Sequence, residues 1–382
     1  MTVPDSVTTK NAPAPAGTVR KADRPAAVPG NEDVRAVTLA RMRSSHRGRN
    51  RRTTAVSTGL VAGLLALFAA SVLLGGLGRV DPADVVPAAF GLRDGLADYV
   101  IFETRIPRAL AALLAGALFG ISGAIYQRLI RNPLATPDIV GISAGAGAGA
   151  TTVFLFAPAP VLVAGFGAPT AAILGSFVLL GLIHVLSSRG GQVDTYRLVL
   201  VGIGMSAICT AYTNYLFTVA DKHSIAIAMR WLIGSVNGVD WTGVTTLATG
   251  FAVCGLCALL LNRSLGSMSL GDELATGLGT HVGRARTAAL LLGAAAAALA
   301  TSVVGPIGFV SLVSGPIAVR LVGSDRALGL SALVGAVLVL GADVLAQNAP
   351  LISPVPTGVL TALLGAPYFV WLILRRRQEA TT

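Results

Sequence analysis

Charged residues are scarce in this sequence. Lys, Arg, Asp and Glu make up 12% of its 382 residues, about half of the roughly 25% found in soluble domains. Hydrophobic residues reach 53%, and the mean hydropathy is +0.73. Apolar runs recur along the whole length, close to the ~20 residues that a helix needs to cross a bilayer. The runs are continuous rather than alternating, which argues against a membrane β-barrel. We therefore expect an all-α polytopic membrane protein.

The sequence also lacks the motifs of common catalytic and metal sites. It contains neither a GxxxxGK[ST] phosphate loop nor an HExxH zinc motif, and its four histidines are isolated from one another. The cysteines, Cys209, Cys254 and Cys257, lie in apolar runs, where packing is the expected role and a single CxxC pair does not make a zinc site. We predict no catalytic residue, no metal site and no directly bound cofactor.

The net charge of +11 is unevenly distributed. Basic residues lie in the two tails and in alternate loops between the apolar runs. This is the pattern of membrane topology rather than of a nucleic-acid surface, so no nucleic-acid partner is expected. The basic N-terminal tail and the C-terminal run Arg375–Arg377 both favour the cytoplasm, which requires an even number of spans.

Three segments are predicted along the chain. Residues 1–53 form a disordered basic cytoplasmic tail, residues 54–375 form a transmembrane domain, and residues 376–382 form a short cytoplasmic tail. The ten predicted spans are 55–77, 107–127, 138–156, 165–187, 197–219, 243–261, 287–303, 306–322, 328–346 and 356–374. Between the seventh and eighth spans, Gly305-Pro306 fits either a hairpin or a kink in one long helix, and the even number favours the hairpin.

Small residues recur at helical spacing in the second and third spans. Gly116 and Gly120 are four residues apart, as are Gly141, Gly145 and Gly149. This spacing lets helix backbones approach closely in lipid, so tight helix packing is predicted there.

A short polar turn, RNPLATPD, joins the second and third spans. We expect Asn132 and Pro133 to set the shape of this turn. Asp138 is placed to favour the start of the third span by capping it and by interacting with the helix dipole. The charge pattern predicts that the turn faces the cytoplasm.

The longest internal cytoplasmic loop runs from Asn262 to Arg286. Leucines recur in it every four residues, at Leu270, Leu274 and Leu278. This spacing predicts a short amphipathic helix from about Ser269 to Leu278 that ends at Gly279. Such a helix can lie in the membrane interface or fill a groove on a soluble partner. Acidic residues in its first turn favour the partner groove.

Apart from Asp138, the first residue of the third span, the predicted spans hold one carboxylate, Asp343, near the outer end of the ninth. It is either a functional group or the partner of a polar group near the interface. So few titratable groups argue against a carrier driven by an ion gradient without excluding it. A transporter of this kind would take its energy from another polypeptide. Candidate pathway residues, chosen by polarity alone, are Ser206, Thr210, Tyr212 and Asn214 in the fifth span.

Several separated motifs, in a constant order, resemble those of one transport family. They are RIPRALAALLAGALFGISGAIYQRLIRNPLATPDIVGISAGA, SLGDELATGLG, GPIGFVSLVSGPIAVRLVGSDRALGLSALVGAVLVLGADVLA and PTGVLTALLGAPYFVWLIL. Together they cover roughly residues 55–375 and are similar to the FecCD/BtuC-type permeases of bacterial ABC importers, which move ferric siderophores, haem or cobalamin. MRWLIGSVNGVDW is similar to permeases of the ferric-enterobactin group.

The resemblance implies a BtuC-like, type II permease fold of ten helices in the bacterial cytoplasmic membrane, with both termini cytoplasmic. It implies two ATPase subunits, on which ATP acts, and a second permease subunit, identical or paralogous. It also implies a substrate-binding protein that docks from outside. The predicted loop helix matches the segment that docks into the ATPase, through Leu270, Gly271, Asp272, Glu273, Ala275, Leu278 and Gly279.

The resemblance also places Arg105 and Arg108 at positions that receive acidic residues of the binding protein. Arginine suits this role because its planar fork holds a carboxylate in two hydrogen bonds. The alternative is that both arginines end the second span by pairing with Glu103.

One departure concerns the same docking surface. Some relatives carry an arginine where this sequence has Gln347, and an acidic residue where it has Pro354. Docking is therefore expected to be weaker here, or to use Lys222 or Arg230.

The expected function is that of a permease subunit of an ABC importer, which moves a ferric siderophore and has no enzymatic activity of its own. An importer of haem or cobalamin and an ion-driven secondary carrier are the alternatives. A polytopic membrane enzyme is the least favoured, because the sequence holds no catalytic constellation.

Overall fold

A computed structural model describes residues 31–75, 96–157, 167–189, 192–323, 328–348 and 355–379. The chain divides into two compact units, Met1–Gly48 and Arg49–Thr382, and the second holds nearly all of the described elements. Those elements are helical except for two short strands, β1 (Ser188–Arg189) and β2 (Gln192–Val193), which pair antiparallel.

Each of the ten predicted spans contains a helix in the described part of the chain. The helices are α1 (Asn31–Leu74), α4 (Ile106–Ile130), α5 (Ile142–Phe156), α7 (Gly167–Ser187), α8 (Thr195–Val219), α10 (Trp241–Met268), α12 (Val282–Val304), α13 (Val310–Val322), α14 (Leu328–Asn348) and α15 (Thr357–Glu379). Within the described ranges, seven segments are long and apolar enough to cross a membrane, by length and composition. Ile142–Phe156, Val310–Val322 and Thr357–Trp371 are shorter apolar helices.

Several short elements connect these helices. They are α3 (Leu96–Tyr99), a π-helical turn η1 (Val100–Arg105) that leads into α4, a 3-10 turn η2 (Pro137–Val140), α9 (Lys222–Ile233) and α11 (Asp272–Gly277). The sequence did not predict α9, which lies in a stretch expected to be an external loop. It begins because Asp221 caps it, accepting hydrogen bonds from the backbone N–H groups of His223 and Ser224.

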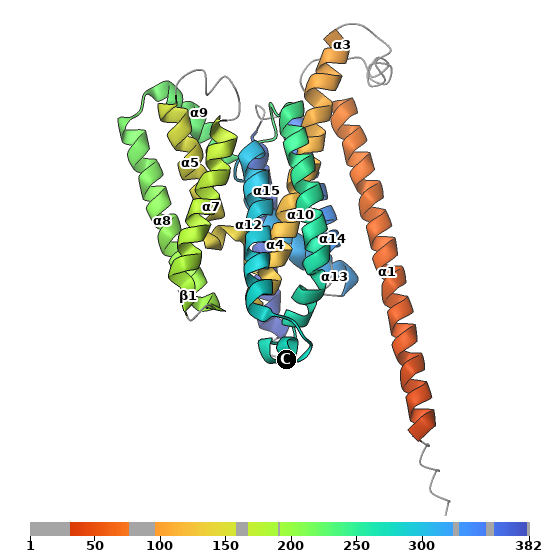
Figure 1. Ribbon diagram of the computed structural model, residues 1–382. Coiled ribbons are helices and arrows are strands. Elements are labelled where there is room, and N and C mark those ends of the chain that lie inside the picture. The colour runs from red at the N-terminus through yellow and green to blue at the C-terminus, as the bar shows by residue number, and fades with distance from the viewer. Residues whose placement is uncertain are drawn as a thin grey trace, which may run out of the picture. The chain divides into compact units, whose positions relative to one another are not determined.

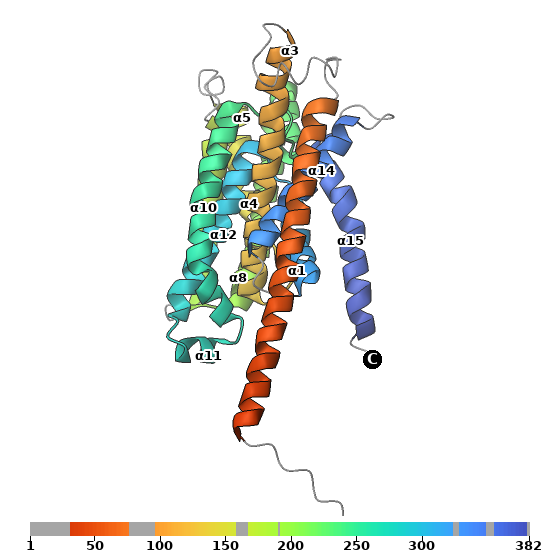
Figure 2. The same cartoon turned by 90° about the vertical axis from the view of Figure 1, so that its right-hand side faces the viewer.

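The centre of the second unit is α4, which packs against α10, α12, α13 and α14. Figure 2 shows α4 between α10 and α14. The close approach depends on glycine: a Cβ at Gly116 would overlap the carbonyl oxygen of Gly335, and one at Gly120 would overlap that of Ser331. The predicted tight packing at Gly116 and Gly120 is confirmed.

A second tight contact joins α5 to α7, on the side of the bundle where Figure 1 also shows α8 and α9. A Cβ at Gly145 would overlap the carbonyl oxygen of Gly175, and one at Gly149 would overlap that of Ala171. Gly141 has another role, because its φ of 76° ends η2 and begins α5 in the left-handed region.

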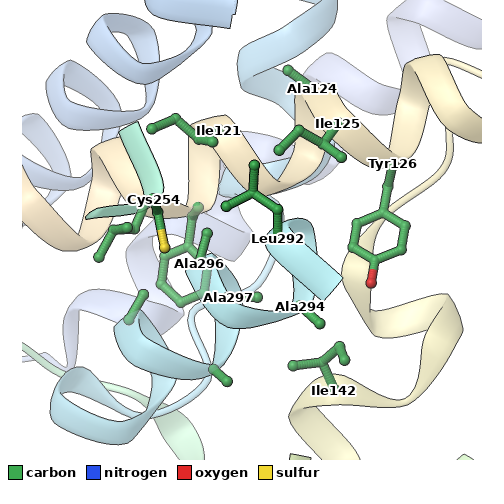
Figure 3. Close-up of a cluster of buried hydrophobic side chains, with 14 of the residues drawn as sticks. Ile121, Ala124, Ile125, Tyr126, Ile142, Cys254, Leu292, Ala294, Ala296 and Ala297 are labelled. Carbon is green, nitrogen blue, oxygen red and sulfur yellow. The ribbon is translucent and has the colours of Figure 1, made fainter. Parts of the chain in front are cut away.

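An apolar core fills the space between α4, α5, α10 and α12 (Figure 3). Two of its polar side chains are paired with backbone carbonyls, as a water-free interior favours. The Tyr126 hydroxyl donates to the Leu290 carbonyl at 3.2 Å, and the Ser122 hydroxyl donates to the Gly293 carbonyl at 2.6 Å. Cys254 packs in this core as the sequence suggested.

The chain between α12 and α13 is neither a kink nor a tight hairpin. Gly305 ends α12 with a φ of 72°, and α13 begins at Val310 rather than at the predicted residue 306. At 1.5 Å per residue, the 13 residues of α13 reach about 20 Å, short of the ~30 Å hydrocarbon layer. The Gln127 amide donates to the carbonyl oxygens of Ser311 and Leu312, so α13 starts beside the last turns of α4.

The predicted boundaries of the tails are also revised. The helix α1 begins at Asn31, so residues 31–53, expected to be disordered, are helical. No proline interrupts Asn31–Leu74, and arginine is a good helix former, so a basic composition did not prevent helix formation here. At the other end α15 continues to Glu379. The rest of the predicted tails, and Pro354, lie outside the described residues.

Candidate functional site

A short helix, α11, projects at the end of the bundle where α15 also ends (Figure 2). Its six residues, Asp272–Gly277, lie between Gly271, with a φ of 114°, and Gly279, with a φ of 82°. Glycine adopts these positive φ values without the strain that a Cβ would cause. The helix is shorter than the predicted Ser269–Leu278, because Ser269 still belongs to the end of α10. Gly279 follows its end, as predicted.

One face of this region is apolar and exposed. The side chains of Leu270, Leu274 and Leu278 are 59%, 61% and 66% exposed. Ala275 faces the other way and is fully buried. Exposed leucines that repeat on one face of a loop are a feature of contact surfaces. We call these three leucines the α11 leucine face.

Two arginines hold α11 in place through Asp272. One carboxylate oxygen accepts a hydrogen bond from Arg131 at 2.6 Å, and the other accepts one from Arg286 at 2.8 Å. Arg131 also donates to the Met268 carbonyl at 2.9 Å. Burial by itself would raise the pKa of Asp272, but the hydrogen bonds and charges of Arg286 and Arg131 outweigh it and lower that pKa. The leucine face is therefore tied to the polar turn that holds Arg131 and to the start of α12.

The predicted roles in the RNPLATPD turn are partly revised. Asn132 sets the turn, since its side chain accepts a hydrogen bond from the Leu134 N–H at 3.0 Å, and Pro133 follows it directly. Asp138 does not cap α5 in the usual way, because the N-cap of α5 is Gly141. Its carboxylate instead accepts a short hydrogen bond from the Ser143 hydroxyl, in the first turn of α5.

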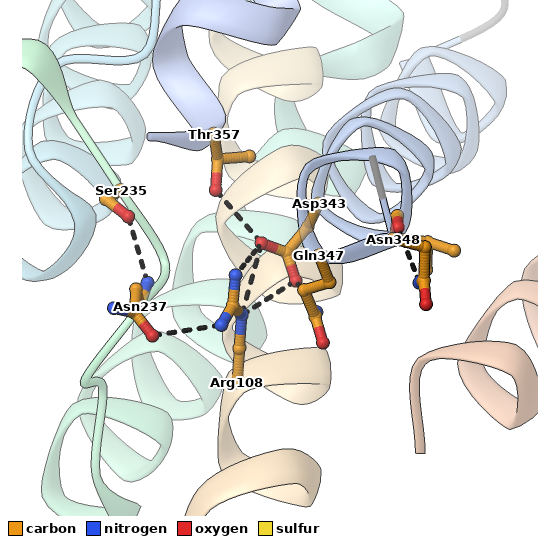
Figure 4. A network of polar contacts seen from close by, with 8 residues as sticks. Arg108, Ser235, Asn237, Asp343, Gln347, Asn348 and Thr357 are labelled. Atoms are coloured by element: carbon orange, nitrogen blue, oxygen red, sulfur yellow. Dashed lines mark hydrogen bonds and ion pairs between the residues drawn. The ribbon is translucent and has the colours of Figure 1, made fainter. Parts of the chain in front are cut away.

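A second polar cluster is buried at the other end of α4 (Figure 4). Asp343, fully buried on α14, accepts three hydrogen bonds from Arg108, at 2.8, 3.0 and 3.2 Å. Gln347 donates to it at 2.6 Å and Thr357 at 3.0 Å. Arg108 also donates to the Asn237 side chain at 2.9 Å. We call these five residues the Arg108 network.

The Arg108 network joins four parts of the fold. They are α4, α14, the chain after α9 and the first residue of α15. Of the two interpretations of Asp343, partnership with a polar group is confirmed. The sequence missed this pairing because Arg108 and Asp343 are 235 residues apart. The sequence did hold one signal of this pairing. Arg108 and Asp343 lie near those ends of the second and ninth spans that are predicted to be on the same side of the membrane.

The geometry is unfavourable for docking through Arg105 and Arg108. Their exposures are 6% and 7%, and Arg105 donates to the Val72 carbonyl at the end of α1, at 2.8 Å. Neither makes a salt bridge with Glu103 in the described residues. Docking at these arginines stays a prediction that this arrangement does not support. Lys222 and Arg230 on α9 are exposed.

The predicted pathway residues lie on α8, which has an exposed face. Thr210, Tyr212 and Asn214 are exposed, and Ser206 is partly buried and donates to the Gly202 carbonyl at 2.8 Å. The Tyr212 hydroxyl lies 3.1 Å from that of Thr152 on α5. Their role in a pathway stays a prediction. No group of three potential metal ligands occurs among the described residues.

A family model described as the FecCD transport family matches residues 63–375. The chain is 37% identical over 325 residues to the probable siderophore transport system permease protein YfhA of Bacillus subtilis, which covers 83% of this chain and 94% of that protein. It is 35% identical over 332 residues to the ferric enterobactin transport system permease protein FepG of Escherichia coli, covering 85% and 95%. It is 36% identical over 284 residues to the hemin transport system permease protein HmuU of Yersinia pestis, covering 74% and 85%.

A solved structure is also similar. It is an inward-facing conformation of a metal-chelate type ABC transporter, with a TM-score of 0.71 and 28% sequence identity. The match covers 84% of this chain and 99% of that one.

Proposed function

The chain belongs to the FecCD transport family, and on that premise we propose that it moves a ferric siderophore across the bacterial cytoplasmic membrane as the permease subunit of an ABC importer. Relatives over most of its length are named as siderophore and ferric enterobactin permeases. The hemin permease among them makes haem the second candidate substrate. Nothing observed favours cobalamin or an ion-driven carrier.

The observation that carries the proposal is the α11 leucine face. Fully burying a leucine side chain contributes roughly 1.5–3 kcal/mol, so three leucines that are about three-fifths exposed would contribute roughly 3–5 kcal/mol on burial. Asp272 holds the helix in position before a partner arrives, which lowers the entropic cost of binding. The partner is an ATPase subunit, whose groove takes the leucine face.

Force passes from α11 to the spans through Arg131 and Arg286. Arg131 directly follows α4, and Arg286 lies in the first turns of α12. A movement of α11 therefore reaches two central helices by direct ion pairs, as a rigid-body coupling requires.

The orientation follows from charge. The basic residues in the first half of α1 and at the end of α15 favour the cytoplasm, and α11 lies at the same end as the end of α15 (Figure 2). Both termini and α11 are therefore cytoplasmic, and the start of α9 faces outward. The assembly contains two ATPase subunits, a second permease, identical or paralogous, and an external binding protein. ATP acts on the ATPase, and this subunit binds no cofactor.

Uptake of radiolabelled ferric siderophores by cells that lack the endogenous permease tests the function. Wild-type protein should restore uptake, and Leu278→Asp should lower it by about tenfold or more, because a charge replaces part of the apolar contact. Ser269→Asp is the matched control, since it adds the same charge in the same exposed loop and keeps the leucine face. Membrane levels of all three proteins are compared by immunoblot. Normal uptake by Leu278→Asp would contradict the proposed contact, and haem uptake without siderophore uptake would reassign the substrate.

A further inference from the structure

A crevice of about 190 Å³ lies between α13, α14 and α15 and shares no residue with the Arg108 network or α11. Its lining is mostly apolar and includes Val313, Ile317, Leu338, Leu364 and Tyr368. Leu364 is 47% exposed, so the crevice opens to the surface of the described chain. An apolar cavity of roughly 150 Å³ stays dry and accepts hydrocarbon. The crevice can therefore hold part of a hydrocarbon chain.

Two arginines lie at one end of this region. Arg52, on α1, donates to the carbonyl oxygens of Leu321 at 2.8 Å and Arg320 at 3.4 Å. These carbonyls belong to the last turn of α13, whose dipole favours a cation there. Arg320 follows Ile317 by three residues, so it lies one helical turn beyond the crevice lining.

The two arginines have no carboxylate partner among the described residues. The salt bridges found there involve Arg108, Arg131 and Arg286. Both Arg52 and Arg320 are exposed. The guanidinium of Arg320 instead lies over the Trp371 ring, 4.4 Å from its centre. The cluster thus carries two positive charges that described acidic groups do not neutralise.

Aromatic side chains connect Arg320 to the crevice. Tyr368, which lines the crevice, and Trp371 have ring centres 5.7 Å apart. The Tyr368 hydroxyl is buried and has no hydrogen-bond partner among the described residues. Tyrosine and tryptophan gather at membrane–water interfaces, where an apolar body meets a polar boundary. Along the site a cation is followed by the aromatic pair and then by the apolar crevice. This order suits a phospholipid, whose charged headgroup would meet the cation and whose acyl chain would meet the crevice.

We propose that an anionic phospholipid of the cytoplasmic leaflet binds at this site, with its phosphate beside Arg52 and Arg320 and one acyl chain in the crevice. Basic pockets between transmembrane helices on the cytoplasmic side bind anionic headgroups. Charge complementarity selects an anionic over a zwitterionic lipid. The choice of leaflet rests on the proposed orientation, whereas the site itself does not depend on the transported substrate. The lipid joins α1, α13 and α15 at the end where α11 lies.

The test is quenching of tryptophan fluorescence by brominated lipids in nanodiscs that contain the full purified transporter. Brominated phosphatidylglycerol and brominated phosphatidylcholine are titrated at equal mole fractions, and Trp371 reports the site. Two arginines near an anionic headgroup together predict a preference for the anionic lipid of roughly thirtyfold. Arg52→Gln/Arg320→Gln should abolish the preference. Arg263→Gln/Arg284→Gln is the matched control, because it removes the same charge from exposed positions on α10 and α12. It should keep the preference.

A second variant tests the crevice separately from the charge. Leu364→Trp enlarges a partly exposed lining side chain and should weaken quenching by both lipids at the site. Equal quenching by the two headgroups in the wild type, or no effect of Arg52→Gln/Arg320→Gln, would overturn the proposal. If quenching of the wild type never exceeds that of a Trp371→Phe variant, lipid does not reach the site. Another protein surface, such as a second copy, would then cover the crevice, and this result would also overturn the proposal. Failed siderophore uptake with an intact lipid preference would instead reject only the proposed function.

Discussion

Replacing Arg108 with methionine should destabilise the protein strongly, because it leaves the Asp343 carboxylate buried without its charged partner. Asp343 is fully buried and accepts five hydrogen bonds from described residues. Three of the five come from Arg108, so the variant would keep only those from Gln347 and Thr357. A carboxylate offers about four lone-pair sites and needs most of them satisfied when no water is near.

The expected size of the effect follows from the burial of both partners. Removing one member of a buried ion pair costs about 3–5 kcal/mol, whereas replacing both members by apolar groups is often neutral. The double variant Arg108→Met/Asp343→Leu should therefore be more stable than Arg108→Met alone. Arg108→Lys should fall between, because lysine keeps the charge but loses the planar fork that bonds both carboxylate oxygens.

The free energy of unfolding in denaturant, measured on the purified proteins in detergent, checks this prediction. The four proteins of the double-mutant cycle are compared, and the coupling energy is the difference between the double variant and the sum of the single ones. Asp240→Asn serves as a control, since Asp240 is an N-cap with an exposed side chain. Additive single effects, with no recovery in the double variant, would refute the view that Arg108 and Asp343 stabilise each other as a pair.

Two further predictions concern α4 and α11. Gly120→Val should lower the thermal midpoint and the membrane level of the protein far more than Gly181→Val. A Cβ at Gly120 would overlap the Ser331 carbonyl, whereas one at Gly181 meets open space. Equal effects of the two variants would contradict the packing argument. The pKa of Asp272 is held below its ordinary value of 3.8, so its ion pairs with Arg131 and Arg286 are present above that value and are lost as pH falls through the lower folded pKa. Arg286→Gln should move this loss to higher pH, read from the mobility of a spin label at Leu274→Cys, and an unchanged transition would show that the ion pair does not hold α11.

The helical spans were predictable because hydropathy reports them directly. Apolar length found the ten long apolar helices of the described residues, and the glycine spacing at Gly116 and Gly120 indicated where helices would meet. Hydropathy does not report at which residue of an apolar run a helix begins. The residues at 306–309 are as apolar as a span, yet they are not helical, because Gly305 and Phe309 both have positive φ values. The prediction of a full eighth span failed for that reason.

The candidate site was predictable in composition but not in pairing. The leucine repeat and the glycines located α11, although its helix is shorter than the repeat suggested. Asp272 was recognised as acidic, but its partners Arg131 and Arg286 lie 141 and 14 residues away. The resemblance, not hydropathy, assigned Arg105 and Arg108 to an outer docking surface. Their burial depends on acceptors, Asp343 and the Val72 carbonyl, that only the tertiary structure brings close.

The separation of Arg108 from Asp343 has a consequence for biosynthesis. The acid is translated 235 residues after the arginine, and at roughly 5–20 residues per second this takes about 10–50 seconds. During that interval α4 is already made, while α14 does not yet exist. Arg108 lies near one end of its helix, so its long side chain can reach the headgroup region until its acceptor arrives. Only the arrival of α14 supplies the acceptor, so the Arg108–Asp343 pair forms late in the assembly of the chain.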